Sequence, residues 1–133
     1  MSLTLAQART MIDAALVEAE RLGTKMNVAV GDPGGNLIAH VRMDGSFFGS
    51  VGISIDKAWS SAAFRMPTSH LQGISKPDGP AWGFAHNNGG RAMVFPGGLP
   101  VFHDGELIGA IGASGGSVEE DVAVAQAGVD ALG

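Results

Sequence analysis

The sequence predicts a single α+β domain, an α/β sandwich in which helices flank a five-stranded antiparallel sheet. Two observations lead to this class. Helical periodicity marks both ends of the chain, and turn signals at residues 32–35 and at Asp104-Gly105 each join two apolar runs. Tight hairpins force their strands to run antiparallel, which argues against a doubly wound parallel sheet. A chain of 133 residues has the size of one domain, so residues 1–133 are assigned to one core.

The chain begins with a predicted helix and hairpin. A capping box at Thr4 and Gln7 opens the helix, which ends before Gly23. Its apolar residues recur at helical spacing: Ala8, Met11, Ile12, Ala15, Leu16, Ala19 and Leu22. Two short apolar runs, 27–31 and 37–42, then form the strands of the first hairpin.

The middle of the chain predicts a second helix and a long loop. Apolar residues at helical spacing cover 50–65, and Pro67 stops this helix because proline cannot continue the hydrogen-bonded turns. Residues 69–90 are rich in glycine and proline and show no periodicity. A loop of this length inside a small domain is typical of a functional or interfacial segment.

The last third predicts three strands and a helix. The strands are 91–95, 99–103 and 106–113, and Asp104-Gly105 is the hairpin turn between the last two. A second capping box, at Ser117 and Glu120, opens the final helix. The residues that this helix is expected to bury are Val118, Val122, Ala125 and Val129.

Composition excludes several classes of function. The net charge is −5 and the eight Lys and Arg residues are scattered, so nucleic acid is not expected as a partner. Cysteine is absent, which excludes disulfides, thiolate metal sites and a Cys nucleophile. No apolar run is long enough for a membrane span and no leader is recognisable, so we expect a cytoplasmic protein. Charged residues make up only 16%, which favours self-association.

The glycine-rich stretch before the last helix is a candidate anion site. Ser114, Gly115, Gly116 and Ser117 lie where a strand ends and a helix begins. Unpaired N–H groups and the helix dipole favour a carboxylate or phosphate at such a place, and the glycines let a ligand approach the backbone. The alternative is that the glycines only permit tight packing while Ser117 caps its helix. No lysine follows the glycines, so the stretch is not a Walker motif.

A second candidate group lies in and after the long loop. His86 and Asn87 are followed by Arg91 in an aromatic environment. An imidazole titrates near neutrality and can move a proton, so His86 is the candidate general acid or base and Arg91 the candidate electrophile. The alternative is an ordered loop at a subunit contact.

Four further residues are candidate ligand contacts. Arg42 could bind an anion or pair with a neighbouring aspartate, and Lys57 could be a desolvated amine or an ordinary solvated lysine. Met43 and Phe47 could line an apolar pocket, although core packing is the default interpretation of such side chains. His40 and His103 are interpreted as structural residues, and no histidine spacing indicates a metal site.

Several motifs together resemble one family. They are Val30-Gly-Asp-Pro-Gly-Gly-Asn-Leu37, Arg42-Met-Asp-Gly45, Lys57-Ala58, Arg91-Ala-Met-Val-Phe-Pro-Gly-Gly-Leu-Pro100 and Ile108-Gly-Ala-Ile-Gly-Ala-Ser-Gly-Gly-Ser117. Over nearly its whole length the chain resembles the GlcG/HbpS family, which includes the C-terminal domain of PduO-type proteins. The resemblance implies a profilin-like sheet, assembly as a homo-oligomer, and haem or a corrinoid as ligand. Haem-binding relatives carry a threonine near the end of the last motif, where this chain has Ser117.

Three functions remain open at this point. The first is a binding protein for haem or another tetrapyrrole, with the propionates received by Arg42 or by the glycine-rich helix start. The second is an enzyme acting on a small carboxylate-bearing metabolite through His86 and Arg91. The third is an oligomeric assembly protein that needs no ligand.

Overall fold

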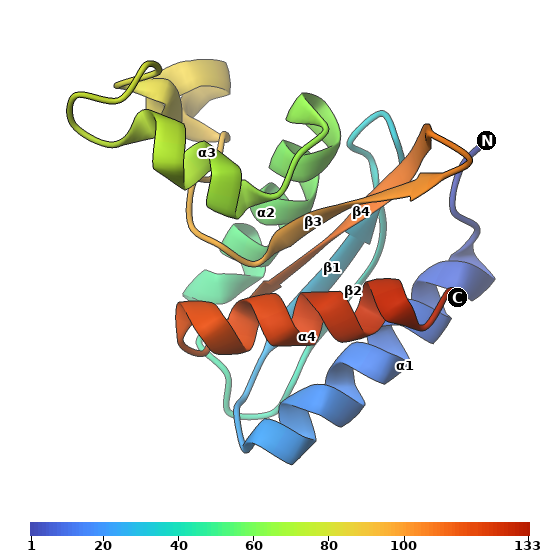
Figure 1. Cartoon of the computed structure of the whole chain (residues 1–133). Helices are drawn as coiled ribbons and strands as arrows, with labels where there is room; N and C mark the ends of the chain where they lie inside the picture. The colour runs from blue at the N-terminus through green and yellow to red at the C-terminus, as the bar shows by residue number, and fades with distance from the viewer.

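The computed structural model describes residues 1–133 and consists of a four-stranded sheet with helices on both faces (Figure 1). The elements in order are α1 (Leu5–Leu22), β1 (Asn27–Gly31), β2 (Leu37–Arg42), α2 (Gly49–Phe64), α3 (Thr68–Ser75), the 3₁₀ segment η1 (Phe84–Gly90), β3 (Gly98–His103), β4 (Glu106–Ser114) and α4 (Val118–Asp130). Both predicted capping boxes are present, at Thr4 and at Ser117. None of the helices combines the length and the apolar character needed to cross a membrane.

The sheet is antiparallel throughout, with the strand order β2-β1-β4-β3. Asn27 on β1 lies opposite Arg42 on β2 and opposite Ser114 on β4, so these three residues share one end of the sheet. β3 is an edge strand. The N–H of Gly98 on its outer side donates to Thr68 Oγ1 at 2.9 Å, and Pro100 follows two residues later.

The expected fifth strand does not form. Residues 91–95 are turn and irregular backbone. Their backbone N–H and C=O groups bond to a side chain of α2 instead of to a neighbouring strand. Met93 N donates to Ser60 Oγ at 2.7 Å, and Ser60 Oγ lies 3.4 Å from the carbonyl oxygen of Arg91. The predicted profilin-like character stays a prediction, whereas the α+β class with helices on both sheet faces is confirmed.

The predicted loop 69–90 contains two helical segments, α3 and η1. Pro67 precedes α3, whose buried residues are only Thr68 and Leu71, so its apolar pattern is too short to be recognised from periodicity. η1 is kinked at Asn87–Gly89 and has no buried residue. Together they form an arm that extends beyond the end of α2 (Figure 1).

The two faces of the sheet are covered differently. α1 and α4 pack together on one face and form the main core, whose largest buried side chains include Met11, Met26 and Ile111. α2 covers the opposite face, and α3 contacts the edge strand β3. There a Cβ on Gly112 would lie 2.1 Å from the carbonyl oxygen of Ser54. The glycine of β4 and the small polar residues of α2 therefore allow a very close approach of helix and strand.

α4 is rotated relative to the predicted apolar stripe. Val118, expected to be buried, is 44% exposed, and the buried positions are Asp121, Val124, Ala125 and Gly128. The reason is electrostatic, because Asp121 turns inward to meet a buried lysine of α2. Ala125 is buried as predicted.

Candidate functional site

A buried ion pair lies beneath the glycine-rich turn. Lys57 Nζ is 2.9 Å from Asp121 Oδ2, and the two side chains keep 2% and 6% of their surface exposed. Lys57 Nζ also donates to Ala113 O at 2.8 Å, while Gly116 N donates to Asp121 Oδ1 at 2.9 Å. Burial lowers the pKa of Lys57 and raises that of Asp121, and the opposite charge of each partner counteracts both shifts. Because each group has a second hydrogen bond, we take the pair to be ionised at neutral pH.

The glycine-rich turn itself is closely packed. A Cβ on Gly115 would lie 2.3 Å from Lys25 O, and one on Gly116 would lie 2.8 Å from Thr24 Oγ1. Ser117 caps α4, with its hydroxyl accepting from Glu120 N and its own N–H donating to Glu120 Oε1. Ser114 is buried at the end of β4. Packing against residues 24–26 therefore accounts for both glycines, and an anion-binding role for this turn stays a prediction.

Arg42, Met43 and Phe47 lie near that turn. Met43 is joined to Met26 by two hydrogen bonds, one from Met43 N to Met26 O and one from Met26 N to Met43 Sδ. Arg42 and Met43 line a hollow of ≈ 310 Å³ together with Glu20, Lys25 and Asp44. The Phe47 ring is 72% exposed, and its carbonyl accepts from Asn27 Nδ2. The structure thus gathers these residues at one end of the sheet, beside Met26 and Asn27 of β1 and its preceding turn.

His86, Asn87 and Arg91 are placed elsewhere. His86 is exposed on η1, and Asn87 Nδ2 donates a hydrogen bond to Phe84 O at 2.6 Å. The Arg91 guanidinium is 3.2 Å from Asp56 Oδ1 and 4.8 Å above the Trp59 ring. No hydrogen bond or ion pair joins these residues to the glycine-rich turn. Their catalytic roles stay predictions, and Arg91 already has two partners.

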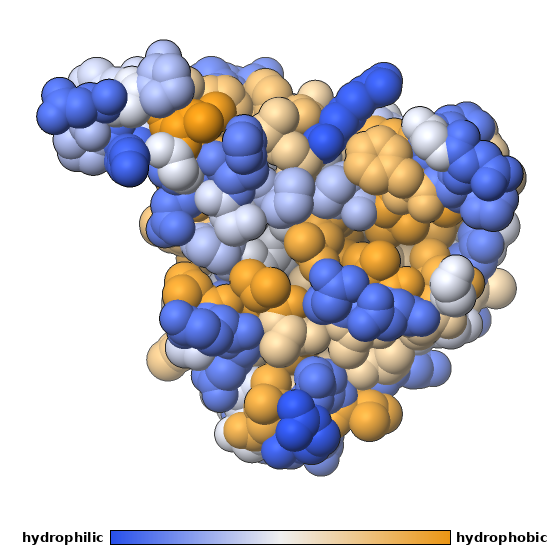
Figure 2. All heavy atoms as spheres, viewed as in Figure 1, coloured by the Kyte–Doolittle hydropathy of each residue, from blue (hydrophilic) through white to orange (hydrophobic).

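A more apolar hollow opens where the β3–β4 hairpin meets α4. Figure 2 shows apolar atoms gathered there on the surface. The hollow has a volume of ≈ 470 Å³, and its apolar wall contains Val101, Phe102, Ile108, Val129 and Leu132. His103 lines the same hollow, with its imidazole 61% exposed and its Nε2 3.4 Å from Asp104 Oδ2. A histidine, a side chain that can bind a metal ion, thus lies beside apolar side chains.

A haem ligand would make two demands on the residues of these hollows. A haem requires an apolar surface for its ring and, in most proteins, an axial side chain for its iron. The hairpin hollow supplies both, whereas the other two hollows contain no histidine. The remaining histidines lie apart, with His40 on β2, His70 on α3 and His86 on η1. No three His, Asp or Glu side chains converge as an independent metal site.

His103 lies beside a hairpin turn, where structural histidines are common, and its interpretation as a structural residue stays a prediction. In the sequence, its position is marked only by the pair Phe102-His103 at the end of an apolar strand. Its meaning depends on the α4 residues Val129 and Asp130, which reach the hairpin only through the fold.

Comparison with known proteins gives a consistent result. A family model described as "Haem degrading protein HbpS-like" matches residues 3–130. The uncharacterized 15.0 kDa protein of the dhaT-dhaS intergenic region of Citrobacter freundii is 36% identical over 129 residues, which is 97% of this chain and 91% of that protein. The corrinoid adenosyltransferase PduO of the same organism is 29% identical over 132 residues. The match covers 99% of this chain but only 39% of the length of PduO. A crystal structure of a PduOC:heme complex superimposes with a TM-score of 0.95 at 30% identity, covering 98% of this chain and 95% of that one.

Proposed function

This chain belongs to the HbpS-like family, and on that premise we propose that it binds haem or a related tetrapyrrole. The observation that carries the proposal is the similarity, over 98% of the chain, to a structure solved as a complex with haem. Haem is the first candidate ligand and a corrinoid the second, since the PduO similarity extends over only part of that protein.

We place the tetrapyrrole in the hairpin hollow. Phe102 and Ile108 offer apolar contact to a flat ring, and burial of such a surface contributes roughly 25 cal/mol per Å². His103 would hold the iron through its imidazole, and Asp104 at 3.4 Å from Nε2 is placed to orient that ring. Bound haem would supply redox and ligand-binding chemistry, while the protein supplies the apolar wall and the axial side chain.

The test is a titration of the purified chain with haemin, followed by the absorbance of the Soret band. A saturable change is expected, and His103→Gln should weaken binding at least about tenfold, a loss of about 1.4 kcal/mol. His70→Gln is the matched control because it removes an exposed imidazole from α3. A linear, unsaturable rise in absorbance would contradict haem binding, whereas saturable binding unaffected by His103→Gln would contradict only this location.

The glycine-turn end of the sheet is tested in the same titration. If Arg42 or Ser117 receives the propionates, Arg42→Gln and Ser117→Ala should weaken binding while His103→Gln does not. The hairpin proposal expects the reverse pattern. Repeating the titration with cobalamin distinguishes haem from a corrinoid, because a haem-specific site leaves the cobalamin spectrum unchanged.

We further propose that the chain self-associates. Phe47 and Phe48 at the start of α2 expose 72% and 84% of their surface, and adjacent apolar rings of this exposure are typical of interaction surfaces. Light scattering after size exclusion should give a mass above 13.5 kDa for the wild type and a lower mass for Phe47→Ser/Phe48→Ser. A monomeric wild type would contradict the proposal.

A further inference from the structure

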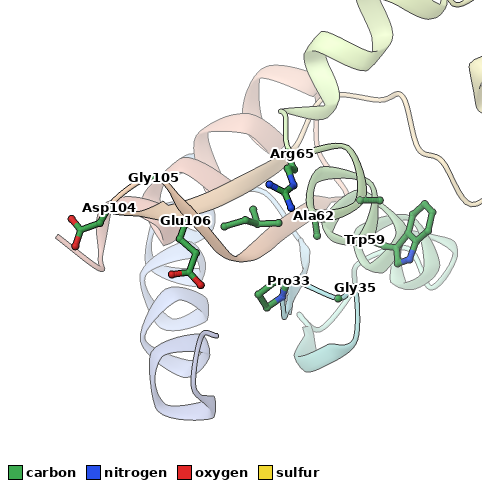
Figure 3. Close-up of a pocket in the computed structure, with 11 residues that line it drawn as sticks. Pro33, Gly35, Trp59, Ala62, Arg65, Asp104, Gly105 and Glu106 are labelled. Atoms are coloured by element: carbon green, nitrogen blue, oxygen red, sulfur yellow. The ribbon is translucent and has the colours of Figure 1, made fainter. Parts of the chain in front are cut away.

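The largest hollow of the molecule lies on the other face of the sheet from the hairpin hollow, beside α2. Its volume is ≈ 660 Å³, within the range of roughly 300–1,000 Å³ typical of small-molecule sites. The turn 33–35, the end of α2 and the hairpin turn 104–106 surround it (Figure 3). Three separate connections of the chain thus meet at one concave surface.

A cation without a protein partner points into this hollow. In Figure 3 Arg65 projects into the space between Trp59 on one side and Glu106 on the other. Its guanidinium makes no hydrogen bond or ion pair with the protein, in contrast to Arg21 and Arg91. The backbone of Arg65 is left-handed, with φ 58° and ψ 38°, a conformation that residues other than glycine and asparagine seldom adopt. A planar guanidinium is suited to two-point binding of a carboxylate.

The wall next to this cation is apolar and rigid. A Cβ on Gly35 would lie 2.6 Å from Trp59 Cδ1, so the turn backbone rests on the indole, and Arg91 stacks on the ring at 4.8 Å. Ala62 and Leu107 add further apolar surface. The wall is therefore in place before any ligand arrives.

Neither acidic residue of the rim forms an ion pair with this cation. Glu106 Oε1 is 2.6 Å from the N-terminal ammonium, and this contact lowers the pKa of Glu106. In Figure 3 the Asp104 carboxylate points away from the hollow. We propose that this hollow binds a small organic carboxylate with a planar apolar body, whose carboxylate pairs with Arg65 and whose body lies against Trp59 and Leu107.

The test uses phenylacetate as the probe and ¹H–¹⁵N NMR of the full chain as the readout. Phenylacetate should shift the signals of Gly35, Gly105 and the Trp59 indole N–H in a saturable manner. Phenylacetamide, which lacks the charge, and phenethylamine, which reverses it, should bind at least about tenfold more weakly.

Arg65→Asn removes the cation and keeps a residue that tolerates the left-handed backbone, so the fold is expected to persist. It should weaken phenylacetate binding at least about tenfold, while Arg9→Asn, which removes an exposed arginine from α1, should not. Absence of shifts at the hollow, equal binding of phenylacetamide, stronger binding of phenethylamine, or unchanged binding by Arg65→Asn would each overturn the proposal.

Discussion

Lys57 and Asp121 connect α2 to α4 through the interior of the protein, with 2.9 Å between Nζ and Oδ2. The two residues are 64 positions apart in the sequence, and both also bond to backbone near the glycine-rich turn. The pair therefore fixes how α2, the end of β4 and the start of α4 lie relative to one another.

Removal of one partner should destabilise the protein strongly. Lys57→Met leaves Asp121 buried without its cation, and such changes cost about 3–5 kcal/mol. Asp121→Asn added to Lys57→Met removes the stranded charge and keeps an acceptor for Gly116 N, so it should restore at least half of the loss. Urea unfolding at pH 7 measures both variants. A double variant as unstable as Lys57→Met would contradict the ion-pair explanation.

The contact between β4 and α2 should not tolerate a methyl group at Gly112. The new Cβ would lie 2.1 Å from Ser54 O and 2.7 Å from Ala58 N, so Gly112→Ala should cost about 1–3 kcal/mol or more. Gly52→Ala is the control, because it adds the same methyl group on the partner helix α2. Nothing lies within 4 Å of that position, and alanine there should stabilise by about 0.5–1 kcal/mol. Thermal melting compares the two, and equal effects would refute the close-packing argument.

Acidification should destabilise the chain partly through His40. Burial lowers the pKa of His40 from its ordinary value of 6.5, and its Nε2 is buried without a hydrogen-bond partner. The unfolded chain therefore binds a proton more readily than the folded one, and stability falls as the pH drops below about 6.5. Urea unfolding at pH 7.5 and 5.5 should show a smaller loss for His40→Leu than for the wild type. His70→Leu is the control and should lose as much as the wild type.

Arg65 should carry a conformational cost. The backbone at position 65 is left-handed, and glycine adopts this conformation without strain. Arg65→Gly should therefore raise the free energy of unfolding by about 0.5–1 kcal/mol. The same change should abolish phenylacetate binding in the largest hollow, the one beside α2 that Arg65 lines. Denaturant unfolding checks the first expectation and NMR the second. A less stable glycine variant would show that the side chain contributes more to the fold than its backbone costs.

Local signals were sufficient for most of the fold. Thr4 and Ser117 cap their helices through residues three positions away, and the hairpin turns involve neighbouring residues only. Residues 91–95 were predicted as a strand because they are apolar, but Ser60, 33 positions from Met93, binds their backbone. The phase of α4 likewise depends on Lys57. Such contacts follow from tertiary packing, which a periodicity analysis does not contain.

The candidate sites were less accessible to sequence reasoning. The motif residues Arg42, Met43 and Ser114 do come together, because β1 joins β2 to β4 in register. Both larger hollows instead combine segments remote in sequence, as with His103 and Val129, or Arg65 and Pro33. Residue types alone did not mark them, since each side chain is ordinary in its own segment.

The outer edge of β3 also limits how the protein can aggregate. An additional strand needs N–H donors along that edge, but Gly98 N is already bound to Thr68 and Pro100 has none to offer. Two successive outward positions are therefore closed to a foreign backbone. Copies of the chain cannot readily extend the sheet into a continuous ribbon there, so orderly association through side-chain surfaces is favoured over fibril-like growth from this side.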